Sequence, residues 1–327
     1  MAKAPLVRVD DGVTLAMLHP RYWLTWLACL LAVLLAWLPW PVQRRIGAGL
    51  GRLGWKLVPQ RVNDTRINLR LCFPELDDDT REAMARDVFR QGGIGLFETL
   101  NAWFGPASRY DRRIEADGIE HLQAAIAQGR GVILLGAHYS HLDLNGLAIA
   151  RHIPLQVIYR PQNNPVFDWL IRRGRRRHFT GQIDHADMRS LFKALRAGEV
   201  VWTSVDQDFG LKQGIMAPFF GYPAATLTAT SRMARINNSP VLFLHFMRNA
   251  DDDSYRLSVT PMLDDYPSDD DEADATRINA MLERLIRRAP SQYMWFHRRF
   301  KSQPRGSVAP YPEKKKKPKK RRRKTAA

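Results

Sequence analysis

The sequence predicts an α/β fold: a mixed or largely parallel central sheet flanked by helices, with an N-terminal transmembrane helix before it. Two observations carry this prediction. Apolar runs alternate with helical patterns through most of the 327 residues, which is typical of α/β domains. In addition, no charged residue occurs from Tyr22 to Val42, a length that suits a membrane span.

The charge-free stretch begins the predicted structure. Its 21 residues would extend about 30 Å as a helix, the thickness of the hydrocarbon core. Trp23 and Trp26 at one end, with Trp37 and Trp40 at the other, suit the two membrane interfaces. A cleaved signal peptide is disfavoured by the mixed-charge residues upstream and the absence of a small-residue cleavage site downstream. A buried core helix is the alternative.

The chain is strongly basic, with 50 Lys and Arg against 33 Asp and Glu and a net charge of +17. Such a charge attracts nucleic acid, anionic lipid or an acidic protein. Residues 43–59 mix basic and apolar side chains at helical spacing, which predicts a helix along the lipid surface. The tail Glu313–Lys324 has ten basic residues and one acid and is predicted to be disordered. Anionic inner-membrane lipids are its simplest partner; a solvated tail without a partner is the alternative.

Five apolar runs have the length of buried strands, at residues 131–136, 155–159, 200–205, 241–246 and 255–260. Helical patterns cover residues 79–104, 118–128, 142–151, 165–175, 186–197, 226–236 and 270–288. The predicted organisation is an N-terminal segment over residues 1–45 with its anchor at 22–42, a catalytic domain over 46–305 and a disordered basic tail over 306–327. Cys29 and Cys72 have no metal-ligand spacing and no disulfide pattern, so a reducing compartment is expected.

The strongest chemical signal is GVILLGAHYSHLDLNG, in which His138 and Asp143 directly follow an apolar strand that ends at Gly136. Side chains at the carboxyl end of such a strand face the crevice where α/β folds bind substrates. A carboxylate near an imidazole fixes its tautomer and stabilises its protonated form. His138 is therefore predicted to be a general base for an alcohol, with Asp143 as its orienting acid. His141 in the same turn is the alternative base.

Two further segments are candidate binding residues. Five arginines lie between Arg172 and Arg177, either as a solvated basic face or as a phosphate site. Asp206 and Asp208, in DQDFG, follow the strand at 200–205, where carboxylates are costly unless paired. We expect an ion pair between Asp206 and one of these arginines; a metal site at the two aspartates is the rival interpretation.

Seven segments together resemble the lipid A biosynthesis late acyltransferases, and their lauroyl acyltransferase branch in particular. The resemblance covers roughly His19 to Pro304. The segments are HPRYWLTWL, NLRLCFPE, GAHYSHLDL, IYRPQNNPVFDWL, DQDFG, PFFGYPAAT and QYMWFHRRFKSQP.

The resemblance implies a fold like that of the glycerol-phosphate acyltransferases and a single-pass inner-membrane anchor with a cytoplasm-facing site. It implies acyl-acyl carrier protein as donor and a Kdo-bearing lipid A precursor as acceptor, with no metal or organic cofactor. The family's catalytic motif falls on His138 and Asp143, although many lauroyl-type members carry Glu at the second position. A conserved arginine and aspartate fall on Arg175 and Asp206 as substrate-binding candidates.

Two other functions are alternatives. An acyltransferase for a glycerophospholipid or another glycolipid would share the His–Asp motif. A membrane-tethered nucleic-acid-binding protein would act through the basic tail, but no nucleic acid partner is expected.

Overall fold

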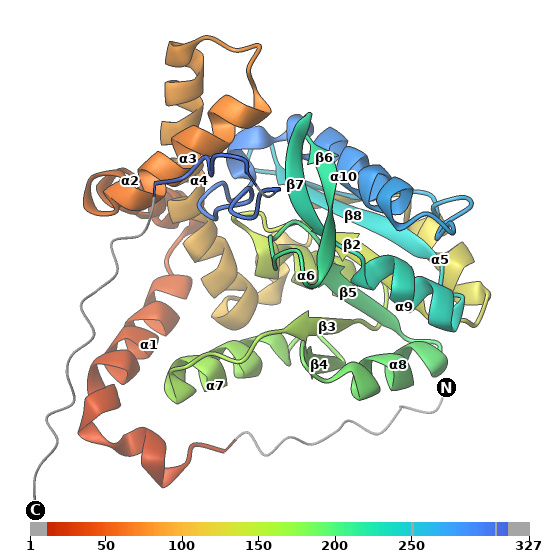
Figure 1. Ribbon diagram of the computed structural model, residues 1–327. Coiled ribbons are helices and arrows are strands. Elements are labelled where there is room, and N and C mark those ends of the chain that lie inside the picture. Colours follow the sequence, from red (N-terminus) through yellow and green to blue (C-terminus); the bar gives the residue numbers. More distant parts are fainter. Residues whose placement is uncertain (1–11, 250–251, 305, 313–327) are drawn as a thin grey trace, which may run out of the picture.

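A computed structural model describes residues 12–249, 252–304 and 306–312; the predicted tail at Glu313–Lys324 lies outside them. Its centre is a seven-stranded sheet of order β1-β9-β8-β2-β5-β3-β4 (Figure 1). Neighbouring strands are parallel except β8 and β9, so the predicted mixed α/β sheet is confirmed. The strands are β1 (Ile114–Asp117), β2 (Val132–Gly136), β3 (Gln156–Tyr159), β4 (Gly181–Asp184), β5 (Val200–Ser204), β8 (Val241–Arg248) and β9 (Tyr255–Val259). A separate antiparallel hairpin pairs β6 (Gly214–Phe219) with β7 (Tyr222–Leu227).

Both faces of the sheet are covered by helices. Because side chains alternate along a strand, Val132 and Leu134 of β2 enter one apolar core, whereas Ile133 and Leu135 enter the other. The first core is closed by α5 (Ile119–Ala127), α6 (Leu142–Ala150) and α7 (Pro165–Arg175). The second is closed by α8 (Met188–Arg196), α9 (Ala229–Asn237) and α10 (Asp271–Arg288).

The five predicted strands and the helices that follow them are present. Sequence patterns missed β1, β4, β6 and β7. Of these, β1 and β4 are edge strands. Residues of β1 alternate between half-buried and exposed, and those of β4 are mostly half-buried, so neither strand has a continuous apolar run. The predicted helix at 226–236 begins instead at Ala229, because β7 extends to Leu227.

The prediction of one continuous 21-residue helix over residues 22–42 is wrong. Helix α1 (Trp23–Ala36) has only 14 residues, about 21 Å at the usual rise. The chain then turns, and α2 (Trp40–Leu57) begins after Pro39, since the residue before a proline is driven out of helical conformation. Among the helices of the described residues, none combines the length and apolar character that crossing a membrane requires.

Buried polar groups stabilise this turn. The side-chain amide of Gln43, which is fully buried, donates to the carbonyl oxygens of Leu35, Ala36 and Leu38 at 2.9–3.0 Å. Arg109 donates to two of the same carbonyls. The end of α1 is thus satisfied by side chains instead of by a continuing helix.

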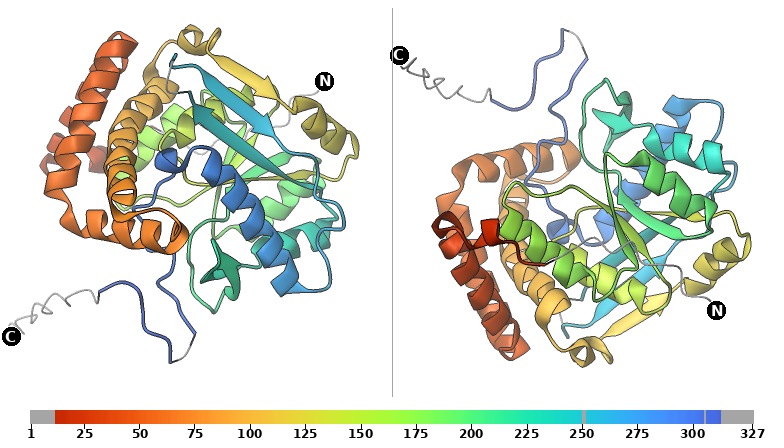
Figure 2. Two further views of the ribbon diagram at one scale, coloured as in Figure 1. Left: turned by 90° about the horizontal axis from the view of Figure 1, so that it is seen from above. Right: turned by 90° about the horizontal axis from the view of Figure 1, so that it is seen from below.

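Helices α1, α2, α3 (Pro59–Cys72) and α4 (Asp78–Phe104) gather at one side of the sheet domain (Figure 2). Helices α2 and α4 cross at van der Waals contact of their backbones. A Cβ atom at Gly51 would lie 2.2 Å from the carbonyl oxygen of Phe89, and one at Gly93 would lie 2.1 Å from that of Gly47. Small residues permit this approach, which fixes α4 beside the carboxyl ends of the strands.

Candidate active site

His138 and Asp206 meet at the carboxyl edge of the sheet. Strands β2 and β5 are parallel neighbours, with Gly136 paired to Ser204, and each functional residue stands two positions beyond its strand's last pair. The Nδ1 atom of His138 lies 2.8 Å from Oδ1 of Asp206. The backbone N–H of His138 donates to Oδ2 of the same carboxylate at 3.0 Å. Asp206 therefore holds both the ring and the backbone of the histidine.

This contact sets the tautomer of His138. Since an ionised carboxylate only accepts, Nδ1 carries the proton and Nε2 is the unprotonated nitrogen, which accepts. Burial lowers the pKa of the His138 imidazole, but the charge and hydrogen bond of Asp206 outweigh burial and raise that pKa above the ordinary value of 6.5. Burial likewise raises the pKa of the Asp206 carboxyl, yet His138 holds it well below its usual range. The pair is poised to stabilise an imidazolium.

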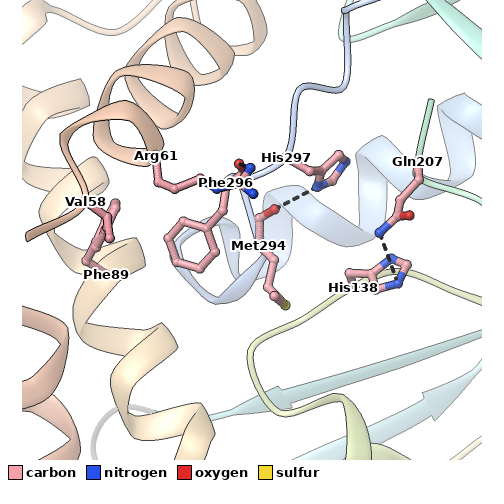
Figure 3. Close-up of a pocket in the computed structure, with 8 residues that line it drawn as sticks. All are labelled: Val58, Arg61, Phe89, His138, Gln207, Met294, Phe296 and His297. Carbon is pink, nitrogen blue, oxygen red and sulfur yellow. Dashed lines mark hydrogen bonds between the residues drawn. The ribbon is translucent and has the colours of Figure 1, made fainter. Parts of the chain in front are cut away.

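The Nε2 side of His138 opens into a pocket of about 400 Å³ (Figure 3). Gln207 and Ser204 approach this nitrogen, with the amide nitrogen of Gln207 at 3.3 Å and Oγ of Ser204 at 3.5 Å. The pocket's other residues are mostly apolar and come from α3, α4, the α2–α3 junction and the segment after α10: Val58, Arg61, Phe89, Met294, Phe296 and His297. An imidazole nitrogen with an accepting lone pair thus faces a cavity whose size and lining suit an apolar chain.

Asp143 does not contact His138, so the expected His138–Asp143 pairing is wrong. Asp143 lies in the first turn of α6 and accepts from Arg175, with Nε at 2.6 Å and a terminal nitrogen at 3.3 Å. Helix α6 begins at Leu142, directly after His141. Although Asp143 is close to His138 in sequence, its position on this helix places its side chain against Arg175 at the end of α7. The guanidinium remains close enough for its charge to lower the pKa of His138.

The expected pairing of Asp206 with an arginine is also wrong, because Asp206 is fully buried beside His138. Its carboxylate bonds to the ring and the backbone N–H of His138 and has no exposed surface for the substrate contact that the resemblance implied. Asp208 accepts from the backbone and hydroxyl of Ser302 and from the backbone of Gly210. Both carboxylates of the rival metal interpretation are thus engaged by protein donors. Within the described part of the chain, no cluster of three or more His, Cys, Asp or Glu could hold a metal.

The basic cluster on α7 is largely tied into the fold. Arg172 pairs with Asp168 at 3.0 Å, and Arg177 donates to the carbonyl oxygens of Trp103 and Gly105. Arg173 lies over the ring of Trp169. Neither the solvated face nor the phosphate site describes the whole cluster; Arg175 is the member that pairs with Asp143.

Comparison with known proteins assigns the family. The family model for bacterial lipid A biosynthesis acyltransferases matches residues 12–302. The chain belongs to this family. It is 40% identical to the lipid A biosynthesis lauroyltransferase of Escherichia coli and 39% identical to the palmitoleoyltransferase, covering 90% of this chain and 97% and 96% of theirs. The myristoyltransferase of the same organism is 28% identical over 90% of this chain and 92% of its own. The predicted resemblance to late acyltransferases is confirmed.

The loop that carries His138 is held by the segment that follows α10. Tyr139 forms an isolated antiparallel bridge with Tyr293. The backbone N–H of Met294 donates to the carbonyl oxygen of His138, and that of Ser140 donates to Gln292, both at 2.9 Å. The residues around His138 therefore have a second strand-like support from the C-terminal part of the domain.

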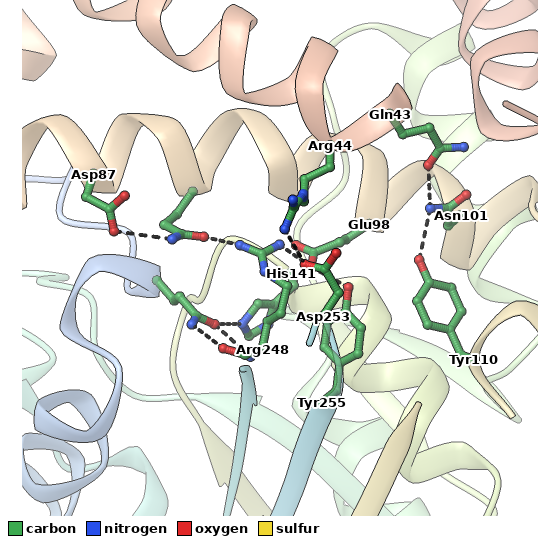
Figure 4. A network of polar contacts seen from close by, with 12 residues as sticks. Gln43, Arg44, Asp87, Glu98, Asn101, Tyr110, His141, Arg248, Asp253 and Tyr255 are labelled. Atoms are coloured by element: carbon green, nitrogen blue, oxygen red, sulfur yellow. Dashed lines mark hydrogen bonds and ion pairs between the residues drawn. The ribbon is translucent and has the colours of Figure 1, made fainter. Parts of the chain in front are cut away.

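A buried polar network extends this support to α4 and β8 (Figure 4). Arg248, at the end of β8, forms an ion pair with Glu98 of α4 at 2.6 Å, and Tyr255 donates to the same carboxylate. The amide of Gln292 bonds to both backbone groups of Arg248 and accepts from Nε2 of His141 at 2.9 Å. This network fixes the loop that carries His138.

His141 is a structural residue. It is fully buried, and burial lowers its imidazole pKa. The neutral ring donates a hydrogen bond to the side chain of Gln292. His138 lines the pocket, whereas His141, the alternative base in the sequence, has no exposed surface. Sequence patterns did not single out Gln207, Gln292 or Glu98; the first of these stood within DQDFG, between the two aspartates already noticed.

Proposed function

We propose that this acyltransferase moves a fatty acyl chain from acyl-acyl carrier protein to a hydroxyl of a Kdo-bearing lipid A precursor. The observation that carries the proposal is the orientation of His138: Nδ1 donates to a buried carboxylate while Nε2 faces a largely apolar pocket. The names of the related lipid A acyltransferases support the class of acceptor.

In this mechanism, Nε2 of His138 takes the proton of the acceptor hydroxyl as the oxygen attacks the thioester carbonyl. Asp206 stabilises the imidazolium that forms. The tetrahedral intermediate then collapses, the C–S bond breaks, and the carrier thiolate takes the proton from His138. Direct transfer requires no acyl-enzyme.

Arg175 and Asp143 act beside the base in our proposal. The carboxylate of Asp143 fixes the guanidinium through two hydrogen bonds. Against the effect of burial, Asp143 raises the pKa of Arg175, so the guanidinium keeps its charge, which also acts on His138. A phosphate or a Kdo carboxylate of the acceptor is the matching group, because guanidinium recognises such oxyanions well. Asp143 then contributes to catalysis through Arg175 and not through His138.

We place the enzyme on the cytoplasmic side of the bacterial inner membrane, with α1 in contact with lipid. Leu24, Leu27, Leu31 and Leu34 are each more than half exposed on one side of this helix, and exposed apolar surface of this kind marks membrane contacts. The free cysteines are consistent with a reducing compartment.

Flotation with vesicles that contain phosphatidylglycerol tests this location. The double variant Leu27→Glu/Leu31→Glu should lose most vesicle binding, whereas Ile236→Glu, equally exposed on α9, should bind as the wild type does. Equal binding by all three proteins would refute lipid contact through α1.

The function is tested by mass spectrometry of reaction products. The full chain is incubated with lauroyl, palmitoleoyl or myristoyl carrier protein and with either a Kdo-bearing tetraacyl lipid A precursor or glycerol 3-phosphate. We expect one acyl chain to be added to the lipid A precursor alone. Acylation of glycerol 3-phosphate alone would favour the glycerophospholipid alternative. Deletion of residues 313–327 should leave most of the acyl-transfer turnover. If the protein instead acted by binding nucleic acid through its tail, this deletion should abolish its function.

A further inference from the structure

We propose that the side-chain amide of Gln207 donates a hydrogen bond to the thioester carbonyl oxygen as that oxygen becomes negatively charged. This inference rests on the proposed acyl transfer and names the group that stabilises its intermediate. Three observations carry it: the position of the amide beside the base, the anchoring of the loop on both sides of Gln207, and the engagement of the nearest backbone N–H groups elsewhere.

The amide nitrogen of Gln207 lies 3.3 Å from Nε2 of His138 (Figure 3). Because Nδ1 of the histidine donates to Asp206, Nε2 accepts, and the contact is an amide donor on the basic nitrogen. Gln207 thus occupies the place that the acceptor hydroxyl takes in the reactive complex. When the hydroxyl binds there, the amide of Gln207 gives up its contact with Nε2 and can reach the reacting carbonyl by a rotation of its side chain.

The residues on either side of Gln207 are fixed. The carboxylate of Asp206 holds His138, and the backbone carbonyl of Asp206 accepts from Nε2 of His297 at 3.1 Å. Asp208 accepts from the backbone N–H and the hydroxyl of Ser302 at 2.8 and 2.9 Å. The half-buried side chain of Gln207, whose amide hydrogen-bonds only to Nε2 of His138 among the described residues, lines the pocket and can rotate while the loop on either side stays anchored.

The backbone around His138 cannot supply this donor in the observed conformation. The N–H of His138 donates to Asp206, that of Tyr139 donates to the carbonyl of Ala137, and that of Ser140 donates to Gln292. One guanidinium nitrogen of Arg61, which also lines the pocket, donates to the carbonyl of Phe296. An oxyanion at this site thus needs a side-chain donor, and an amide serves that purpose in other acyl-transfer enzymes.

The step balances as follows. The acceptor O–H proton moves to Nε2 of His138, the new C–O bond forms, and the carbonyl π electrons move to the oxygen that Gln207 binds. When the C–S bond breaks, those electrons restore the carbonyl, and the thiolate leaves with the proton from the imidazolium. Gln207 neither gains nor loses a proton.

The first test compares kinetics of Gln207→Ala, Gln207→Glu and Gln207→Asn in the full-length enzyme. Loss of an oxyanion donor lowers kcat by about 100- to 1,000-fold, so the Ala and Glu variants should show that loss at nearly unchanged KM and melting temperature. Asn should recover part of the rate. Gln123→Ala, on the exposed surface of α5, should match the wild type.

The second test reads the carbonyl directly. A ¹³C-labelled lauroyl thioester of the carrier protein is bound to His138→Ala, which lacks the base, and its carbonyl stretch is recorded by infrared difference spectroscopy. We expect a shift to lower frequency that disappears in His138→Ala/Gln207→Ala. The same shift in both variants, or full kcat in Gln207→Ala, would overturn this inference while leaving acyl transfer intact. Absence of transfer by the wild-type enzyme would instead overturn the proposed function.

Discussion

His138 and Asp206 each stand two residues beyond a pair of aligned strand ends, and this common register joins them. Gly136 and Ser204 are partners in the parallel β2–β5 ladder, and the imidazole and carboxylate beyond them meet at 2.8 Å. Two short loops leave adjacent strands in the same direction. The sheet itself therefore positions His138, the proposed base, and Asp206, which orients it.

Replacement of His138 should remove the general base. We expect His138→Ala to lower kcat by about 10²- to 10⁴-fold, the usual contribution of general-base catalysis, without unfolding the protein. His185→Ala, half exposed after β4, is the control and should retain activity. Activity near the wild-type level in a folded His138→Ala enzyme would exclude the proposed base.

The Asp143–Arg175 pair should be energetically coupled. Removing one partner of a largely buried pair leaves the other charge uncompensated, so Asp143→Ala should cost about 3 kcal/mol in the free energy of unfolding. Urea unfolding of both single variants and the double variant measures the coupling. Asp111→Ala, which breaks the exposed pair with Arg151, should cost less than about 1 kcal/mol. Strict additivity of the two single substitutions would contradict the coupling.

Gly95 should be required for the position of the catalytic loop. A Cβ atom there would lie 2.2 Å from the carbonyl oxygen of Ser140, so the loop must move in Gly95→Ala. A shift of about 1 Å near a reacting group costs about 100-fold in rate. Gly49→Ala meets no atom within 4 Å and should keep kcat while adding helix stability. Unchanged kcat in Gly95→Ala would show that the loop tolerates the shift.

His245 should make the fold sensitive to acid. Burial first, and then neighbouring positive charges, lower its imidazole pKa to about 3. The unfolded chain therefore binds a proton below about pH 6.5 that the folded chain does not take up until about pH 3, so stability falls as pH decreases through this window. Between pH 8 and pH 5, the wild type should lose about 2 kcal/mol more than His245→Phe does. Equal losses in urea titrations would contradict this contribution.

The sequence predicts much of this fold because its central strands are buried on both faces. Strands β2, β5 and β8 each begin with at least three consecutive apolar residues, and helices α7 to α10 have clear amphipathic patterns. The edge strands β1 and β4 lack that pattern. The apolar run at residues 22–42 predicted too long a helix for a different reason. The turn before Pro39 is stabilised by the side chains of Gln43 and Arg109, and local periodicity does not reveal such contacts.

The candidate site was predicted in part. His138 and Asp206 were both found by their position after a buried strand, but which strands are neighbours in the sheet is not encoded in their local sequence. The shorter sequence separation of Asp143 therefore suggested the wrong partner. Gln292 and Glu98 lie far from His138 in sequence, and only the folded chain brings their network to the catalytic loop.

The most direct test of the account is the single-turnover rate of acyl transfer as a function of pH, in the wild type and in Asp206→Asn. The wild-type rate should rise with pH through an apparent pKa above 6.5, because Asp206 favours protonated His138. In Asp206→Asn, the plateau should fall by about 10⁴-fold, as when an orienting carboxylate is lost in a catalytic triad, and the apparent pKa should fall. An unchanged plateau and pKa in a folded Asp206→Asn enzyme would contradict the assignment of His138 as a base held by Asp206.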